Sequence, residues 1–366
     1  MQYATPFQVF LNIVMFVVIF IMLRKSFNQP QSISKNTIIF AIIVVLFYCL
    51  YAFWGPDYFH YERDFEELKK GGRSNMEDVY HWLVLNISPN YRVFRLIVWG
   101  SALYLLLAII RFSRIPIDVC LLVFSAMYLP WFSYARVSLC MTIIFTGLAI
   151  IVKSNHINFV RVIIGLAIIY LSFYFHKSSP FGIVVSLFSL VLLSNSKGKI
   201  VILIILIPVV IYFLNIYMVP FVTELSMENE TYSSSSYYLA QASRIMGPGE
   251  LIHNFLQRTP YYLLAFMYLR LIYKGGYKSL PIIIRAFANA SFLSVLLSTL
   301  FLFDYGANTY VLYYRFLNFA MIPSTIFLSY CIKEKIFPVL TKVVFIIGVT
   351  ASVYALLYAE YMRLGY

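Results

Sequence analysis

The sequence is short of charge. Only 12% of its 366 residues are Asp, Glu, Lys or Arg, whereas 61% are hydrophobic. Soluble domains carry about 25% charged residues, so this chain has half of the charge that normally covers a water-facing surface. This shortage excludes an ordinary soluble protein and favours a polytopic membrane protein.

The sequence also lacks the usual signatures of disulfide, metal and phosphate-loop chemistry. Its four cysteines show no C-x-x-C spacing, which argues against a disulfide framework or a cysteine metal site. The patterns His-x-x-x-His, a glycine-rich phosphate loop and Gly-x-Ser-x-Gly are absent as well. We therefore expect no metal and no cofactor. The first apolar run has no basic segment or cleavage site before it, so we expect it to remain as a helix.

Long apolar runs are abundant. A membrane-spanning helix needs about 20 mostly apolar residues, and twelve stretches are close enough to this length to qualify. They predict an all-α helical bundle that forms a single transmembrane domain over residues 1–366. The predicted spans are 6–23, 36–54, 93–110, 116–133, 137–152, 160–175, 179–194, 200–219, 260–273, 281–303, 313–331 and 336–358.

The net charge of +13 has an explanation in topology. Basic residues in short loops mark the cytoplasmic side of a membrane protein. With both termini outside the cytoplasm, 16 basic and 2 acidic residues face inward, whereas 12 basic and 13 acidic residues face outward. The excess of positive charge therefore does not indicate binding to nucleic acid.

Two outward segments, residues 55–92 and 220–259, are longer than simple connections. In the first, Asp57 follows a Gly-Pro break and begins a charged helix that ends at Lys70, before two glycines. Apolar residues then recur on one face of an amphipathic helix over 75–87, which we expect on the membrane surface. They are Met76, Val79, Tyr80, Leu83, Val84 and Ile87. The second segment is polar and contains a serine run.

Charged residues at the outer ends of apolar helices are the candidates for a site. Charge is costly there and is usually paired or functional, whereas the charges between Glu62 and Lys70 are typical of a solvated helix. Arg136 and Arg315 are the first choices, because a guanidinium suits two-pronged contacts to phosphate. Snorkelling to lipid headgroups or pairing with an acid such as Asp304 is the alternative. The same argument covers a further group: Arg92, Arg95, Arg244 and Arg258.

Two residues are candidates for acid–base chemistry. His176 ends a predicted span beside Lys177, whose charge favours the neutral imidazole that can accept a proton. The alternative is a hydrogen-bonded structural histidine. Asp57 can be a base or an N-cap. Tyr61 lies on one side of the same charged helix with Tyr58 and Phe65, a side that can face either a sugar or lipid.

At these positions the chain resembles the EpsG branch of the Wzy-type polysaccharide polymerases. The similar features are Gly55-Pro-Asp57-Tyr-Phe-His-Tyr61, Arg136 at the start of a span, Phe175-His176-Lys177-Ser178 and Tyr313-Tyr314-Arg315. They follow in chain order on one predicted face of the membrane. One departure is Val137, where the family often has Gln after the arginine.

The resemblance implies a fold and a reaction. The fold is a bundle related to the GT-C glycosyltransferases in the bacterial cytoplasmic membrane. The reaction joins oligosaccharide repeats carried on undecaprenyl pyrophosphate at the outer face, without a metal and with inversion. Arg136, Arg315 and Arg244, helped by Lys177, Arg95, Arg258 and Tyr61, would bind the pyrophosphate or substrate. His176, which we favour, or Asp57 would be the base.

Three other functions remain open from the residues alone. A lipid-linked glycan transporter or flippase would also use outward arginines, although we find no internal repeat. A polyprenyl-phosphate-sugar glycosyltransferase of GT-C type would use a metal-associated acidic motif, for which Asp57 and Glu62 are candidates. An O-antigen ligase would share the donor and differ in acceptor. Sugar identities, a partner that regulates chain length and the oligomeric state are not determined by the sequence.

Overall fold

The computed structural model describes residues 58–72, 76–128, 135–154, 158–194, 248–300 and 316–363, with a few helical positions between residues 10 and 43. Within these ranges the chain forms helices and no strand, which confirms the all-α class. The predicted spans 6–23, 36–54 and 200–219 lie outside this described part of the chain, apart from those few positions.

A helix is found at each predicted span within the described ranges. The helices are α5 (Tyr91–Phe112), α6 (Ile117–Met127), α7 (Ala135–Ile151), α8 (Phe159–Leu171), α9 (Ser179–Val191), α12 (Pro248–Tyr273), α13 (Ile282–Leu300), α15 (Met321–Lys333) and α16 (Pro338–Arg363). Short 3-10 turns extend α8 over Ser172–Tyr174 and α9 over Leu192–Ser194. Among the residues that the structure describes, three helical segments are long and apolar enough to cross a membrane: Tyr91–Phe112, Ile282–Thr299 and Phe316–Lys333.

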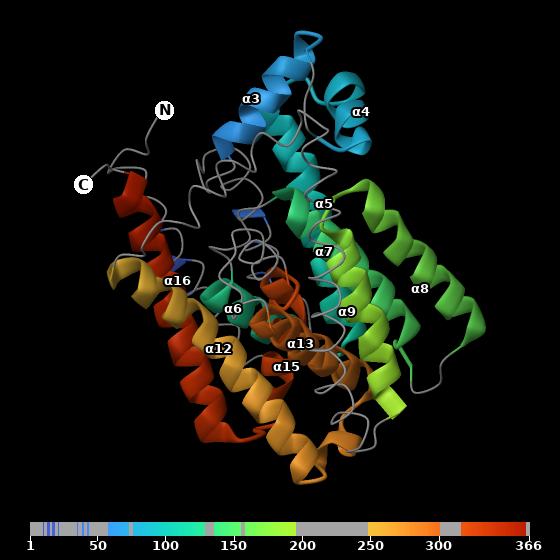
Figure 1. Ribbon diagram of the computed structural model, residues 1–366, viewed down its shortest axis with the longest axis vertical. Coiled ribbons are helices and arrows are strands. Elements are labelled where there is room, and N and C mark those ends of the chain that lie inside the picture. The colour runs from blue at the N-terminus through green and yellow to red at the C-terminus, as the bar shows by residue number, and fades with distance from the viewer. Residues whose placement is uncertain are drawn as a thin grey trace.

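The helices form a bundle with α13 and α15 at its centre (Figure 1). These two helices pack on each other, and α6, α9 and α7 surround them. Helix α7 also packs along α5 and α8, while α12 and α16 pair with each other on the opposite side. Helices α3 (Tyr58–Lys69) and α4 (Asp78–Asn86) lie together at the end of the bundle where α5 begins. This cap is built from the first long outer segment.

Small residues bring the helices close together. A Cβ on Gly147 of α7 would lie 2.6 Å from the carbonyl oxygen of Gly165 in α8, so only glycine permits this crossing. Small residues are common where helices meet in membranes. Helix association there depends on close van der Waals packing, because lipid provides no hydrophobic driving force. The central contact is polar as well, since the hydroxyls of Ser291 in α13 and Ser324 in α15 lie 2.7 Å apart.

The buried side chain of Asn289 in α13 links this helix to α12, to the turn before α13 and to α9. Tyr268 of α12 and Tyr277 each donate a hydrogen bond to Asn289 Oδ1, at 2.8 and 2.7 Å. The Asn289 amide in turn donates to the carbonyl of Ser189 in α9, at 2.9 Å. Tyr277 belongs to the 3-10 turn Gly276–Ser279, which connects α12 to α13. Three of the four hydrogen-bonding positions of this side chain are therefore used inside the bundle.

Basic connections that the sequence places on the cytoplasmic side contact one another in pairs. Lys153 Nζ, after α7, lies 4.7 Å from the ring of Phe112 at the end of α5. Arg270 Cζ, near the end of α12, lies 4.8 Å from the ring of Phe337 in the turn between α15 and α16. These contacts bring connections from distant parts of the sequence to shared ends of the bundle.

The charged helix predicted at residues 57–70 is confirmed as α3, and Gly71 ends it with a φ of 79°. One residue in it was misjudged, because Asp64 is 4% exposed rather than solvated. It lies on the inward face with Tyr61, Phe65 and Leu68, which follow a spacing of one helical face. Phe65 packs against the rings of Tyr91 and Phe94. This face therefore packs against other helices of the protein.

The amphipathic helix predicted at 75–87 is found as α4, and the centre of its apolar face packs into the bundle. Tyr80 and Val84 are fully buried in the bundle, and Tyr80 packs edge-on against Phe94 of α5 and Phe175 after α8. Ile87, at the end of the helix, is 47% exposed. The sequence assigned this whole face to the membrane surface, whereas Phe94 and Phe175 supply aromatic partners for Tyr80 at its centre.

The span predicted at 260–273 begins earlier, since α12 starts at Pro248. A proline fits the first turn of a helix because the amide that it lacks would have no intrahelical partner there. The end of the second outer segment, 248–259, is thus helical. Residues 220–247 of that segment lie outside the described ranges.

Candidate functional site

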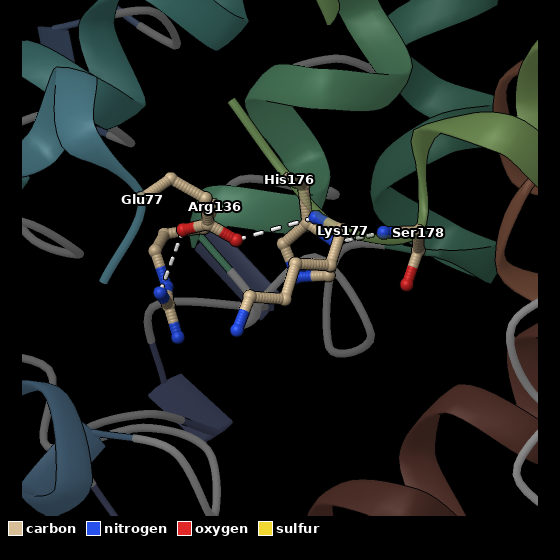
Figure 2. A network of polar contacts seen from close by, with 5 residues as sticks. All are labelled: Glu77, Arg136, His176, Lys177 and Ser178. Atoms are coloured by element: carbon tan, nitrogen blue, oxygen red, sulfur yellow. Dashed lines mark hydrogen bonds and ion pairs between the residues drawn. The ribbon is translucent and has the colours of Figure 1, made fainter. Parts of the chain in front are cut away.

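Three segments that are distant in sequence meet at one end of the bundle, beneath α3. They are the residue before α4, the first turn of α7 and the turn between α8 and α9. Their side chains are Glu77, Arg136, His176, Lys177 and Ser178 (Figure 2). The sequence-predicted residues Arg136, His176 and Lys177 are therefore brought together, and Tyr61 of α3 joins them through Arg136.

Arg136 is held by a buried ion pair. Its Nη1 lies 2.8 Å from Glu77 Oε2, and each side chain is only 10% exposed. Removing one partner of such a pair leaves an uncompensated charge and costs about 3–5 kcal/mol. The guanidinium of Arg136 is therefore fixed in position rather than free to extend to lipid headgroups.

Two tyrosines support the same guanidinium. Arg136 Cζ lies 4.2 Å from the ring centroid of Tyr61 and 6.0 Å from that of Tyr80. Cation–π contacts of this kind contribute about 2 kcal/mol when both groups are desolvated. Burial, followed by the neighbouring Glu77 carboxylate, raises the pKa of Tyr80 well above its usual range. Tyr80 thus stays a neutral aromatic ring at physiological pH.

The edge of Arg136 that carries Nε is not used by Glu77. The pair is made through Nη1, and among the described residues the buried Nε–H has no hydrogen-bond partner. A buried donor without a partner carries a desolvation cost of about 1–3 kcal/mol. An anionic ligand that accepts from Nε would remove this cost.

The turn between α8 and α9 fixes the histidine. His176 Nδ1 accepts a hydrogen bond from the backbone N–H of Ser178, at 2.9 Å. In the neutral ring, an accepting Nδ1 places the proton on Nε2. His176 in this geometry therefore presents Nε2–H as a donor.

The same turn is anchored to Glu77. The backbone N–H of Lys177 donates to Glu77 Oε1, at 3.3 Å, so each oxygen of this carboxylate has its own partner. Figure 2 shows the side chains of Arg136 and Lys177 extending to the same side of the carboxylate. Lys177 is exposed, so its side chain is accessible at this end of the bundle.

Of the other predicted residues, some lie on other helices of the bundle and three lie outside the described residues. Arg95 of α5 is buried, with Cζ 5.9 Å from the ring of Tyr91. Arg258 is half-buried on α12, which packs mainly against α16 on another part of the bundle. Asp57, Arg244 and Arg315 lie outside the described residues.

Sequence reasoning missed Glu77 entirely and treated Tyr80 only as part of an apolar face. A signal was present, because Glu77 directly precedes the amphipathic helix in an outer segment, much as Asp57 follows the second predicted span. The reasoning that selected Asp57 applies equally to an acid at the start of α4. What the sequence could not indicate is the contact with Arg136, which lies 59 positions away.

The arrangement has the chemistry of an anion site. It combines a fixed guanidinium, an exposed lysine and an imidazole whose Nδ1 already accepts a hydrogen bond. Such donors stabilise negative charge that develops on a leaving group, and they do so best where water is largely excluded. Among the described residues, no group of three or more His, Cys, Asp or Glu is placed to hold a metal ion.

The apolar helices and this cationic end define the class: a polytopic helical membrane protein. The chain belongs to the EpsG family, the family of Wzy-type polysaccharide polymerases, because the family model matches residues 36–363. This match confirms the resemblance that the short motifs indicated. No curated protein and no solved structure matches the chain.

Proposed function

We propose that this protein polymerises oligosaccharide repeats carried on undecaprenyl pyrophosphate, at the outer face of the bacterial cytoplasmic membrane. The observation that carries the proposal is the gathering of Arg136, Lys177 and His176 at one end of an EpsG-family bundle. The proposed topology has twelve spans in a GT-C-like bundle, with both termini outside the cytoplasm. A partner that regulates chain length fits this role.

The proposed reaction transfers the growing glycan from its carrier to a new lipid-linked repeat. The acceptor hydroxyl attacks the anomeric carbon, the bond from that carbon to the pyrophosphate oxygen breaks, and the anomeric centre inverts. Undecaprenyl pyrophosphate leaves with an additional negative charge. Arg136 and Lys177 would stabilise this charge, as would Arg315 and Arg244 from segments outside the described residues. Arg95 and Arg258 would contribute to substrate binding from further along the bundle.

The proton of the acceptor hydroxyl needs a base, for which His176 and Asp57 remain the two candidates. With Nδ1 accepting from Ser178, His176 is arranged to donate from Nε2 to a phosphate or sugar oxygen. It can accept a proton at Nε2 only after the other tautomer forms and the Ser178 hydrogen bond is given up. The resting geometry thus favours His176 as a donor and Asp57 as the base.

Reconstitution tests the function directly. The purified protein is placed in liposomes with lipid-linked repeat units, and the products are separated by length, with and without EDTA. We expect long glycans in both conditions. Loss of product with EDTA would favour a metal-dependent GT-C enzyme. Movement of intact lipid-linked repeats across the bilayer without bond formation would indicate a transporter, and transfer only to a different acceptor lipid would indicate a ligase.

Two replacements of His176 distinguish its roles. In His176→Gln the side-chain amide nitrogen lies near the place of Nε2 and can still donate, whereas in His176→Asn the amide lies near the place of Nδ1. If His176 donates from Nε2, the glutamine variant should keep activity about 10-fold or more above the asparagine variant. Initial rates with reconstituted protein measure this difference. Equal, near-complete loss in both variants would instead support His176 as the base.

A further inference from the structure

Glu77 holds together the parts of the site that come from different helices. Its Oε2 accepts from Arg136 Nη1 at the start of α7, at 2.8 Å. Its Oε1 accepts from the Lys177 backbone N–H in the α8–α9 turn, at 3.3 Å. Glu77 itself precedes α4, so one carboxylate connects three segments of the chain.

The form of the contact leaves Arg136 able to bind a ligand. A carboxylate commonly takes an arginine through two parallel hydrogen bonds. Here one oxygen goes to Nη1 and the other to Lys177, and the Nε–H keeps no partner among the described residues. Glu77 thus fixes the orientation of the guanidinium without using the edge that carries Nε.

Stability alone does not require this arrangement. A buried ion pair is often no more stabilising than an apolar pair of similar volume, because both charges must leave water. Aromatic partners are close at hand, since the rings of Tyr61 and Tyr80 contact the Arg136 guanidinium and Phe94 packs on Tyr80. A carboxylate that is 10% exposed in this setting is better explained by the direction in which it holds Arg136.

We propose that Glu77 is a positioning residue for the pyrophosphate of the donor, an inference that rests on the proposed function. Its two oxygens set the distance between the guanidinium of Arg136 and the turn that carries His176 and Lys177. The donor phosphate then meets cations that are already oriented. Glu77 acts through Arg136 and Lys177 and does not touch the reacting atoms.

This role predicts a particular kinetic change. In Glu77→Gln the side-chain oxygen can accept from Arg136 or from Lys177, but the charge that fixes Arg136 is lost. Misplacement of a binding group by about 1 Å can cost on the order of 10²-fold in rate. We expect kcat/KM for the donor to fall about 10-fold to 100-fold, through kcat as well as the donor KM, with the acceptor KM nearly unchanged.

The test compares Glu77→Gln and Glu77→Asp with the matched control Asp78→Asn, whose side chain is exposed on the next residue. Reconstituted enzymes are assayed with varied donor, and farnesyl pyrophosphate is used as a competitive probe of the pyrophosphate site. We expect its inhibition constant to rise at least 10-fold in Glu77→Gln and less in Glu77→Asp, which keeps the charge. The control should behave as the parent protein. Unchanged inhibition in Glu77→Gln, or a loss that only follows the folded fraction, would overturn the proposal.

A charge swap separates this inference from the proposed function. The double variant Glu77→Arg with Arg136→Glu retains an ion pair. Compared with either single variant, it should recover folding but not polymerisation activity. Recovery of activity would mean that the pair only supports the fold, which would contradict the roles of Glu77 and Arg136 and leave the polymerase function standing. Normal activity in Glu77→Gln together with an inactive Arg136→Lys would contradict the role of Glu77 alone.

Discussion

Replacing Arg136 with lysine is expected to abolish polymerisation almost as completely as replacing it with alanine, with a fall of about 10²–10³-fold in kcat. Lysine keeps the positive charge and can still pair with Glu77. It cannot also lie flat on the ring of Tyr61, 4.2 Å away, and offer a second donor in place of Nε. The planar fork, rather than the charge alone, is what the site uses.

Initial rates of glycan extension by reconstituted Arg136→Lys protein measure this effect. The matched control is Arg63→Lys on α3, where the arginine pairs with Glu67 at 3.8 Å on an exposed surface. Exposed pairs contribute little, so the control should retain full activity. Near-normal glycan length from Arg136→Lys, at equal protein levels, would show that a point charge suffices and would contradict the proposed phosphate contact.

The largest effect on stability is expected from Asn289→Leu. Leucine has a similar size but removes the acceptor of Tyr268 and Tyr277 and the donor to Ser189. A buried group left without its partner costs about 1–3 kcal/mol. With two hydroxyls and a carbonyl affected, at about 1–3 kcal/mol each, we expect a loss of about 3–9 kcal/mol.

Thermal unfolding of the purified protein in nanodiscs would record this loss as a lower midpoint. The informative control removes the donors as well, because replacing both partners with apolar groups can be nearly neutral. Adding Tyr268→Phe and Tyr277→Phe to Asn289→Leu should recover at least half of the lost stability. No recovery would mean that the asparagine is required for its shape rather than for its hydrogen bonds.

Much of the fold was predictable because a membrane helix can be recognised from its own apolar composition. The spans that correspond to α5–α9, α13, α15 and α16 were located from apolar runs alone, most to within a few residues. Such runs are read residue by residue and need no knowledge of neighbours. The start of α12 was predicted too late because residues 248–259 are polar, although Pro248 suits the beginning of a helix.

Within the site, prediction succeeded for charged residues that lie at the end of an apolar helix, where charge is unusual. Arg136, His176 and Lys177 were selected because charge at the outer end of an apolar helix is costly, and the structure brings these three together. Asp64 and Glu77 were misjudged or missed because acids in a polar segment look solvated until a partner buries them.

The sequence by itself determined that this chain is a helical membrane protein, which of its helices are apolar, and which cations are expensive enough to suggest function. These properties follow from the transfer of individual side chains between water and the membrane. Only the tertiary structure decided that Tyr80 of α4 packs against Phe175, that Arg136 is held by Glu77 and Tyr61, and that the turn between α8 and α9 is anchored to Glu77. Each of these depends on contacts between segments far apart in the chain, whose meeting no local pattern records.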